Sequence, residues 1–91
     1  MSKKRKMRPS PETPWASVEQ VVNSGAELRV KDGSRNFKIA SLYDGEQLIC
    51  MFECKRMPFR EIMDRLDALA RRYVDEGIVT DEVDGAEYCV L

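Results

Sequence analysis

Three cysteines and one basic junction are the side chains of this sequence that could carry out covalent chemistry. The cysteines are Cys50, Cys54 and Cys89, and the 91-residue chain contains no histidine. Without histidine, the usual general base near neutral pH is missing. Only Cys54 is followed by cations, Lys55 and Arg56, of the kind that lower the pKa of a nucleophilic thiol. A core-facing cysteine at a strand end explains the same position more simply, so the sequence predicts a protein that is not an enzyme.

The same cysteines argue against a disulfide and against a metal centre. Cys50 and Cys54 lie four residues apart in a strand pattern, about 13 Å at about 3.3 Å per residue. That separation is too large for a disulfide between them. Three thiolates without histidine leave a structural zinc site one ligand short. We therefore expect no cofactor and no metal, and free thiols in a reducing compartment.

Two groups of cations are the second chemical feature, and nucleic acid is the ligand that they would fit. The first group is Lys3, Lys4, Arg5, Lys6 and Arg8, and the second, at a strand-to-helix junction, is Lys55, Arg56 and Arg60. Such groups neutralise phosphates and give salt-dependent affinity without sequence specificity. In a eukaryote the first group would also serve as a nuclear import signal. A solubilising tail explains the first group equally well.

The charge of the chain is divided unevenly between its two parts. Residues 1–14 hold five basic side chains and one acidic side chain, a net charge of +4. The remaining 77 residues hold 10 basic and 15 acidic side chains, a net charge of −5, which gives the total of −1. An acidic body is not typical of a stand-alone DNA-binding surface.

The elements that position these side chains follow the order α-β-β-β-α-β-β. Alternating runs separated by Asp-Gly pairs predict a three-strand meander over residues 26–54, and a third Asp-Gly pair predicts a C-terminal hairpin over 78–91. A capping box from Ser17 to Gln20 predicts a short N-terminal helix. One main amphipathic helix starts at Pro58 and carries its apolar stripe on Phe59, Ile62, Leu66, Leu69 and Tyr73.

These elements together predict a small α+β fold. We expect an antiparallel sheet, made of the meander and the hairpin, to pack on the main helix in a single domain over residues 15–91. Residues 1–14 combine a Lys/Arg run with three prolines and show no apolar periodicity. They are therefore expected to form a disordered basic, Pro-rich tail.

The Asp-Gly pairs also predict a register for the meander. If Asp44-Gly45 is a two-residue loop, Ile39 faces Cys50 and Phe37 faces Phe52. These four side chains then lie on the side of the main helix, because a one-residue slip would scatter the apolar positions. The opposite side of the sheet would carry Lys38, Ala40, Leu42, Ile49 and Met51.

That predicted back face is too apolar for a solvated sheet. It would be covered by the N-terminal helix with Trp15, by a second copy of the chain, or by another protein. The C-terminal strand offers another contact, because the unpaired edge of an end strand can pair with another chain.

Two functions follow from these features. The first is a small non-enzymatic regulatory or inhibitory protein that acts by protein–protein contact through Lys38, Ala40, Leu42, Ile49 and Met51 or through a sheet edge. The alternative is a nucleic-acid-associated accessory protein that uses its basic tail. No apolar run approaches the roughly 20 residues of a membrane span, and the basic start leads into no apolar leader. We expect no membrane partner and a cytoplasmic location, or a nuclear one in a eukaryote.

Overall fold

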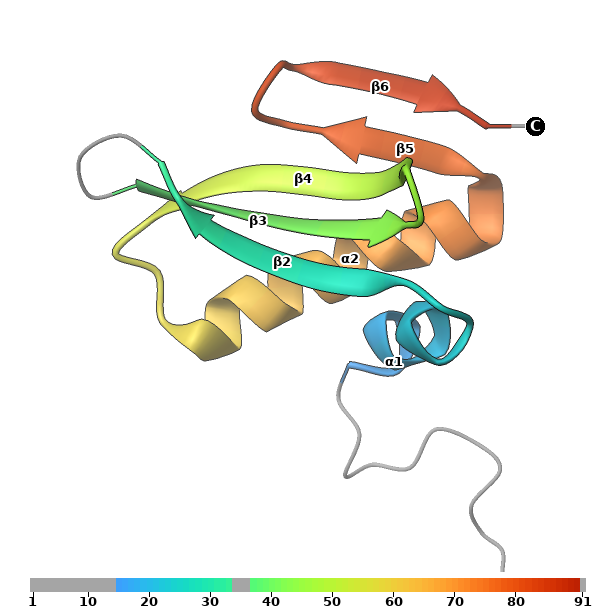
Figure 1. The fold of residues 1–91 in the computed structure, drawn as a ribbon, viewed down its shortest axis with the longest axis horizontal. Coiled ribbons are helices and arrows are strands. Elements are labelled where there is room, and N and C mark those ends of the chain that lie inside the picture. Colours follow the sequence, from blue (N-terminus) through green and yellow to red (C-terminus); the bar gives the residue numbers. More distant parts are fainter. Residues whose placement is uncertain (1–14, 34–36, 91) are drawn as a thin grey trace, which may run out of the picture.

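The computed structural model describes residues 15–33 and 37–90, and these residues form the predicted order of helices and strands. Figure 1 shows the elements α1 (Ala16–Asn23), β2 (Glu27–Asp32), β3 (Phe37–Asp44), β4 (Gln47–Lys55), α2 (Phe59–Glu76), β5 (Ile78–Asp81) and β6 (Ala86–Cys89). The predicted α+β fold is therefore confirmed, including the main helix between the meander and the C-terminal hairpin.

The strands form one five-stranded sheet in the order β2-β3-β4-β5-β6. The β2–β3–β4 meander and the β5–β6 hairpin are antiparallel, as expected. The two parts are joined by a short parallel pairing of β4 with β5, in which Cys50 lies beside Thr80. The α2 helix connects these parallel strands and lies across one face of the sheet (Figure 1). This topology leaves β2 and β6 as the two edge strands.

The stripe of α2 that contacts the sheet is shorter than the sequence predicts. Ile62, Leu66 and Leu69 are buried in the core, whereas Phe59 is 64% exposed. The Phe59 and Trp15 rings form a T-shaped pair, with the centroids 6.3 Å apart. Phe59 occupies the first turn of the helix, where its side chain packs against the start of α1. Its predicted place in the core is wrong.

The α1 helix is held on α2 by a carboxylate from the neighbouring helix. The predicted capping box is wrong, because α1 begins at Ala16 and has no side-chain cap of its own. Instead, the backbone N–H groups of Ser17 and Val18 donate to Oδ1 of Asp67, at 2.8 and 3.0 Å. These two groups are among the four N–H groups that a helix start leaves unpaired. The cap therefore comes from α2, and it joins α1 to the helix side of the sheet.

The register of the meander differs from the predicted one, with consequences for both faces of β3. Cys50 lies opposite Leu42, not opposite Ile39, which is a shift of three residues. An odd shift turns every side chain of a strand to the other face. Ala40 and Leu42 therefore point toward α2 with no exposed surface, and Phe37 and Ile39 point away from the helices. Two residues of the shift come from the turn, because Asp44 pairs with Gln47 and the two-residue loop is Gly45-Glu46. The third comes from a bulge at Ile49, and it makes the shift odd. The other turn is longer than two residues, because Asp32 pairs with Lys38.

A bulge in β4 places one more residue in the core. Tyr43 pairs with Leu48 and Leu42 pairs with Cys50, so Ile49 has no partner on β3. A bulge of this kind lets two consecutive side chains face the same side. Ile49 and Cys50 are accordingly both buried, with 1% and 0% of their surface exposed. Strict alternation along β4 could not predict this arrangement.

Thr80 carries a buried hydroxyl with no hydrogen-bond partner among the described residues. The side chain has no exposed surface and lies beside Cys50 on the helix side of the sheet. An unpaired buried hydroxyl costs about 1–3 kcal/mol. We expect Thr80→Val to raise the free energy of unfolding by about 1 kcal/mol in urea denaturation, because it keeps the volume and removes the hydroxyl. Thr80→Ala, which also leaves a cavity, is the control and should not stabilise; a less stable Val variant would contradict the prediction.

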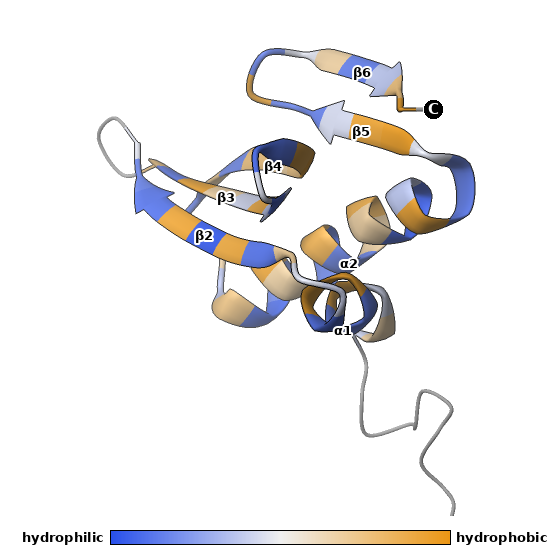
Figure 2. Cartoon of the chain, turned by 45° about the vertical axis from the view of Figure 1, so that its right-hand side comes forward, coloured by the Kyte–Doolittle hydropathy of each residue, from blue (hydrophilic) through white to orange (hydrophobic). Residues whose placement is uncertain are grey.

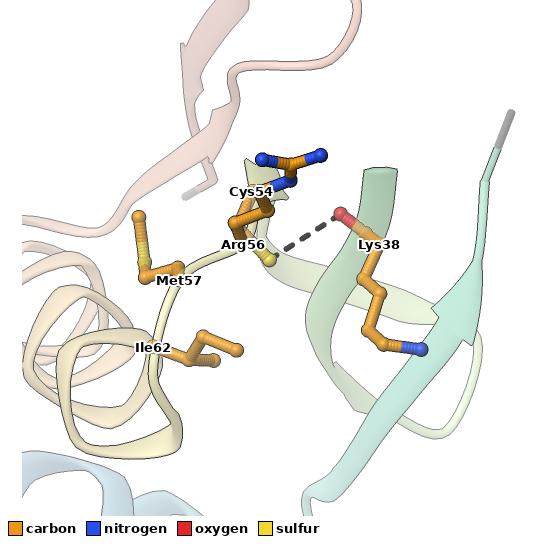
Figure 3. Close-up of a pocket in the computed structure, with 5 residues that line it drawn as sticks. All are labelled: Lys38, Cys54, Arg56, Met57 and Ile62. Carbon is orange, nitrogen blue, oxygen red and sulfur yellow. Dashed lines mark hydrogen bonds between the residues drawn. The ribbon is translucent and has the colours of Figure 1, made fainter. Parts of the chain in front are cut away.

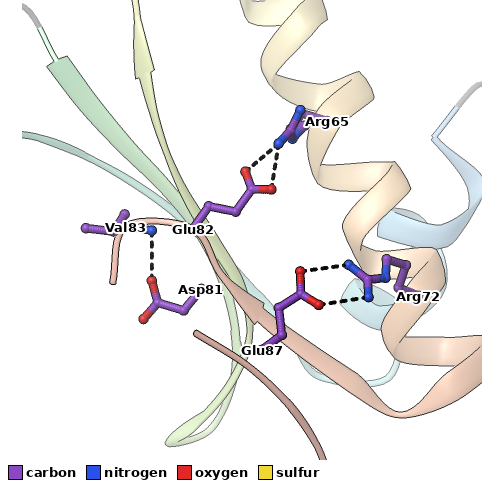
Figure 4. A network of polar contacts seen from close by, with 6 residues as sticks. All are labelled: Arg65, Arg72, Asp81, Glu82, Val83 and Glu87. Atoms are coloured by element: carbon purple, nitrogen blue, oxygen red, sulfur yellow. Dashed lines mark hydrogen bonds and ion pairs between the residues drawn. The ribbon is translucent and has the colours of Figure 1, made fainter. Parts of the chain in front are cut away.

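The C-terminal hairpin is fixed to α2 by two ion pairs (Figure 4). Arg65 Nη2 donates to Oε2 of Glu82 at 2.6 Å. Arg72 forms a bidentate contact with the carboxylate of Glu87, with N–O distances of 3.1 and 3.3 Å. Arg72 also lowers the pKa of Glu87 through this hydrogen-bonded contact. The strand β5 ends at Asp81, whose Oδ1 accepts hydrogen bonds from the backbone N–H groups of Val83 and Asp84, both at 3.0 Å. The hairpin therefore keeps a fixed position on the sheet, with β6 outermost.

Candidate binding surface

The sheet has one face that no described helix covers, which we call the outer face. Its side chains are those that alternate with the core residues and point away from α1 and α2. Val18 and Val21 of α1 belong to the same core cluster as α2, so α1 does not cover the outer face. The apolar members of the outer face are Phe37, Ile39, Tyr43, Leu48, Met51 and Tyr88, together with Val79, which has no exposed surface.

The predicted back face is wrong for four of its five residues. Ala40, Leu42 and Ile49 are core residues on the helix side, because of the three-residue shift and the bulge described above. Lys38 also lies on the helix side, where its ammonium pairs with Asp32 at 2.6 Å. Met51 alone points to the outer face, and it is half-buried. The outer face is thus a different set of side chains from the one that the sequence predicted.

Two aromatic rings on the outer face lie beneath cations. The guanidinium of Arg29 stands 4.4 Å from the centre of the Tyr43 ring. The ammonium of Lys55 stands 5.4 Å from the centre of the Phe37 ring. Contacts of this kind contribute about 0.5–1 kcal/mol at exposed sites. Phe37 and Tyr43 lie toward opposite ends of β3, so a cation stands near each end of the face, and half-buried Ile39 and Met51 lie between them.

The second predicted nucleic-acid group does not converge on one surface. Lys55 extends over Phe37 on the outer face, whereas Arg56 lines a hollow on the helix side. Arg60 is exposed in the first turn of α2. The first group, Lys3, Lys4, Arg5, Lys6 and Arg8, lies outside the described residues. Nucleic-acid binding by these residues stays a prediction.

The hollow beside Arg56 contains Cys54, the one cysteine that is followed by cations in the sequence (Figure 3). It has a volume of about 270 Å³ and is lined by Lys38, Cys54, Arg56, Met57 and Ile62. The Cys54 thiol donates to the backbone carbonyl of Lys38 at 3.4 Å, and burial raises its pKa. A nucleophilic thiol requires the opposite shift. The geometry at Cys54 is that of a protonated side chain at the end of a strand.

The three free cysteines are expected to differ sharply in reactivity. Burial raises the pKa of Cys50 to about 12, and both Cys50 and Cys54 are buried, whereas Cys89 is exposed on β6. We expect one thiol per native chain to react rapidly with a chromogenic disulfide reagent at neutral pH, and three in denaturant. Cys89→Ala is the matched variant and should abolish the rapid reaction. Fast labelling that persists in Cys89→Ala would contradict the buried positions of the other two thiols.

Residues 15–33 and 37–90 contain no group of three or more His, Cys, Asp or Glu side chains arranged to hold a metal ion. Neither described helix is long and apolar enough to cross a membrane. Comparison with models of known protein families, with curated proteins and with solved structures finds no match for this chain.

Proposed function

We propose that this protein is a small non-catalytic binding protein, regulatory or inhibitory in role, that contacts another protein through its outer face. The single observation that supports the proposal is the apolar character of a sheet face that no described helix covers. An antiparallel sheet with one solvated face normally alternates apolar and polar side chains, so that the solvated face is polar. Here the centre of that face carries Ile39 and Met51, and aromatic rings lie at either end of β3.

The arrangement of charge indicates what kind of partner would fit. Arg29 and Lys55 lie over the two aromatic rings, so a cation stands near each end of β3, and the exposed carboxylate of Glu53 lies opposite Ile39 on the same face. A partner that presents an apolar patch between carboxylates would match both features. Aromatic residues and arginine are also the residue types that most often dominate binding energy at interfaces. We propose the cytoplasm as its compartment, in keeping with three free cysteines.

The experiment that tests this function uses two variants that add the same charge to different surfaces. Ile39→Lys with Met51→Lys places two cations in the centre of the outer face. Ala68→Lys with Val74→Lys places two cations on the exposed side of α2. Immobilised wild-type protein and both double variants are incubated with extract of the source cells, and bound proteins are identified by mass spectrometry.

The expected result is a partner that wild type and the α2 variant retain and the outer-face variant loses by at least tenfold. Isothermal titration with the purified partner should then show the same order of affinities. Equal retention by all three proteins, or no specific retention by wild type, would remove the proposal. Far-UV circular dichroism and thermal unfolding verify that each variant is folded.

A second candidate function is favoured by the paired aromatic rings and cations. Exposed aromatic rings on a sheet stack the bases of single-stranded nucleic acid, and each stacked base contributes about 1–3 kcal/mol. Phe37 and Tyr43 provide two half-buried rings on this face, and the basic group in residues 1–14 would add affinity for phosphate. In this second candidate function, the outer face binds nucleic acid together with the basic tail.

Fluorescence anisotropy with labelled single-stranded RNA and DNA at low salt distinguishes the two functions. For the second candidate, Phe37→Ala with Tyr43→Ala should weaken binding at least tenfold. Replacing Lys3, Lys4, Arg5 and Lys6 with Gln should instead reduce the dependence of affinity on salt. Binding that is absent, or that is unchanged in the Phe37/Tyr43 variant, would exclude nucleic acid as the ligand of the outer face.

A further inference from the structure

The two edges of the sheet differ in how they are protected against pairing with another strand. The β2 edge carries Glu27, Arg29, Lys31 and Asp32, and Figure 2 shows hydrophilic and hydrophobic residues alternating along it. Charged side chains of this kind discourage pairing with a further strand. The β6 edge has no lysine or proline, and its one charged residue, Glu87, is held by Arg72. Of the two edges, β6 is therefore the one open to a further strand.

The hydrogen bonds of the hairpin show which backbone groups of β6 are free. The N–H of Val90 donates to the carbonyl of Gly77 at 2.7 Å, so this pair is hydrogen-bonded. Hydrogen-bonded pairs recur at every second residue of an antiparallel ladder, so the N–H and C=O of Tyr88 also point toward β5. The backbone groups of Glu87 and Cys89 then point outward, beyond the sheet. Within the described part of the chain, no strand lies beyond β6 to pair with them.

We propose that this edge binds a second copy of the same chain, with the two β6 strands antiparallel about a twofold axis through Tyr88. The backbone N–H and C=O groups that point outward on one copy can hydrogen-bond only with the outward groups of the other copy. The twofold axis must therefore pass through Glu87, Tyr88 or Cys89. An axis through Glu87 would place two carboxylates opposite each other, which is unfavourable. An axis through Cys89 would leave Glu87 opposite residue 91, beyond β6. With the axis through Tyr88, Glu87 of each copy lies opposite Cys89 of the other. Each of these two pairs forms two backbone hydrogen bonds, which gives four in total.

The side chains of β6 are compatible with themselves in this register. The two Tyr88 rings meet on the outer face, where each is 49% exposed in the single chain. Ala86 of one copy lies beside Val90 of the other, so a small residue faces a larger one. No like charges stand opposite each other, because each Glu87 faces Cys89 and stays paired with its own Arg72. This self-complementarity is the reason to assign the edge to a second copy and not to a foreign strand.

The size of the contact determines its strength. A pairing of five residues per strand falls well below the roughly 1,200–2,000 Å² that specific, stable complexes bury. The dimer is therefore weak, with a dissociation constant of about 10 µM to 1 mM. It would join two five-stranded sheets edge to edge and make their outer faces continuous. The inference rests on the β6 edge and does not depend on the function proposed for the outer face.

The first experiment removes an outward donor without disturbing the hairpin. Cys89→Pro deletes an N–H that points away from β5, and Cys89→Ala is the matched control that keeps it. Sedimentation equilibrium of the full chain between 10 µM and 1 mM should show dimer for wild type and for Cys89→Ala. Cys89→Pro should weaken dimerisation at least tenfold and leave the circular dichroism spectrum unchanged. A wild-type chain that is monomeric at 1 mM overturns the proposal, even where β6 captures a foreign strand.

A second experiment tests the register by cross-linking. Tyr88→Cys combined with Cys89→Ala places two thiols on the twofold axis, where opposed Cα atoms of a non-hydrogen-bonded pair are about 4.5 Å apart. Mild oxidation should link this variant into a disulfide dimer, whereas wild-type Cys89 should remain largely unlinked because it faces Glu87. The reverse result would overturn the axis through Tyr88. Neither experiment alters Ile39 or Met51, so failure here and failure of outer-face binding are separate results.

Discussion

Leu42→Ala is expected to lower the free energy of unfolding by about 3 kcal/mol. Leu42 has no exposed surface and lies between Leu28 and Cys50 on the helix side of the sheet. Truncating a fully buried leucine removes its transfer free energy and leaves a cavity, at a cost of about 2–5 kcal/mol. A domain of this size has only about 5–15 kcal/mol of stability, so the loss should be large in a urea titration.

Ile39→Ala is the matched control for this prediction, because it removes a similar side chain from the same strand. Ile39 is on the outer face and half-buried, so its truncation should cost about 1 kcal/mol or less. The predicted register reverses this order, since it places Ile39 in the core and Leu42 on the opposite face. A larger loss for Ile39→Ala than for Leu42→Ala would therefore show that β3 is turned over.

The elements of the fold were predictable from the sequence because each has a local physical cause. Pro58 fixes the start of α2, and Gly77 ends it at a φ of 71° that favours glycine. The buried Ile62, Leu66 and Leu69 recur at spacings of four and three, which only a helix places on one face. Gly45 and Gly85 both adopt positive φ values at chain reversals between paired strands. Local signals of this kind do not depend on how the strands pair.

The register was not predictable, because an Asp-Gly pair indicates a reversal without fixing where the loop lies, and no local signal marks the bulge at Ile49 that turns β3 over. In β3 both alternating sets contain apolar residues: Phe37 and Ile39 in one, Ala40 and Leu42 in the other. The structure places the smaller alanine against the helix side and leaves the aromatic ring on the outer face beneath Lys55. The long apolar stem of a lysine can cover such a ring while its charge stays in water.

The error in the candidate site follows from the error in register. The predicted loops, together with unbroken alternation along β4, turn Ala40, Leu42 and Ile49 away from the helix, whereas the bulge turns them toward it. The signals of the outer face, Arg29 above Tyr43 and Lys55 above Phe37, lie on neighbouring strands. They become visible only once the cross-strand pairs are known. The expectation of an uncovered, partly apolar sheet face therefore applies to a different set of residues.

Asp67→Ala is expected to lower the free energy of unfolding by about 2–3 kcal/mol and to release α1 from α2. The carboxylate accepts the N–H groups of Ser17 and Val18 in a partly buried position. Its removal leaves two donors unpaired, at about 1 kcal/mol or more each, and takes a negative charge from a helix N-terminus. Trp15 is the only tryptophan of the chain and lies at the start of α1, so its fluorescence reports the docking of this helix.

Two other variants distinguish the hydrogen bonds that Asp67 accepts from the nearby Trp15–Asp64 hydrogen bond and from the negative charge of Asp67. Asp64→Ala removes the exposed hydrogen bond from Trp15 Nε1, at 2.8 Å, and should cost less than 1 kcal/mol. Asp67→Asn keeps an acceptor oxygen and loses only the charge, so its stability should fall between wild type and Asp67→Ala. In Asp67→Ala the fluorescence transition should precede the circular dichroism transition in urea, because α1 detaches before the sheet unfolds. Coincident transitions with a loss no larger than that of Asp64→Ala would show that Asp67 does not hold α1 in place.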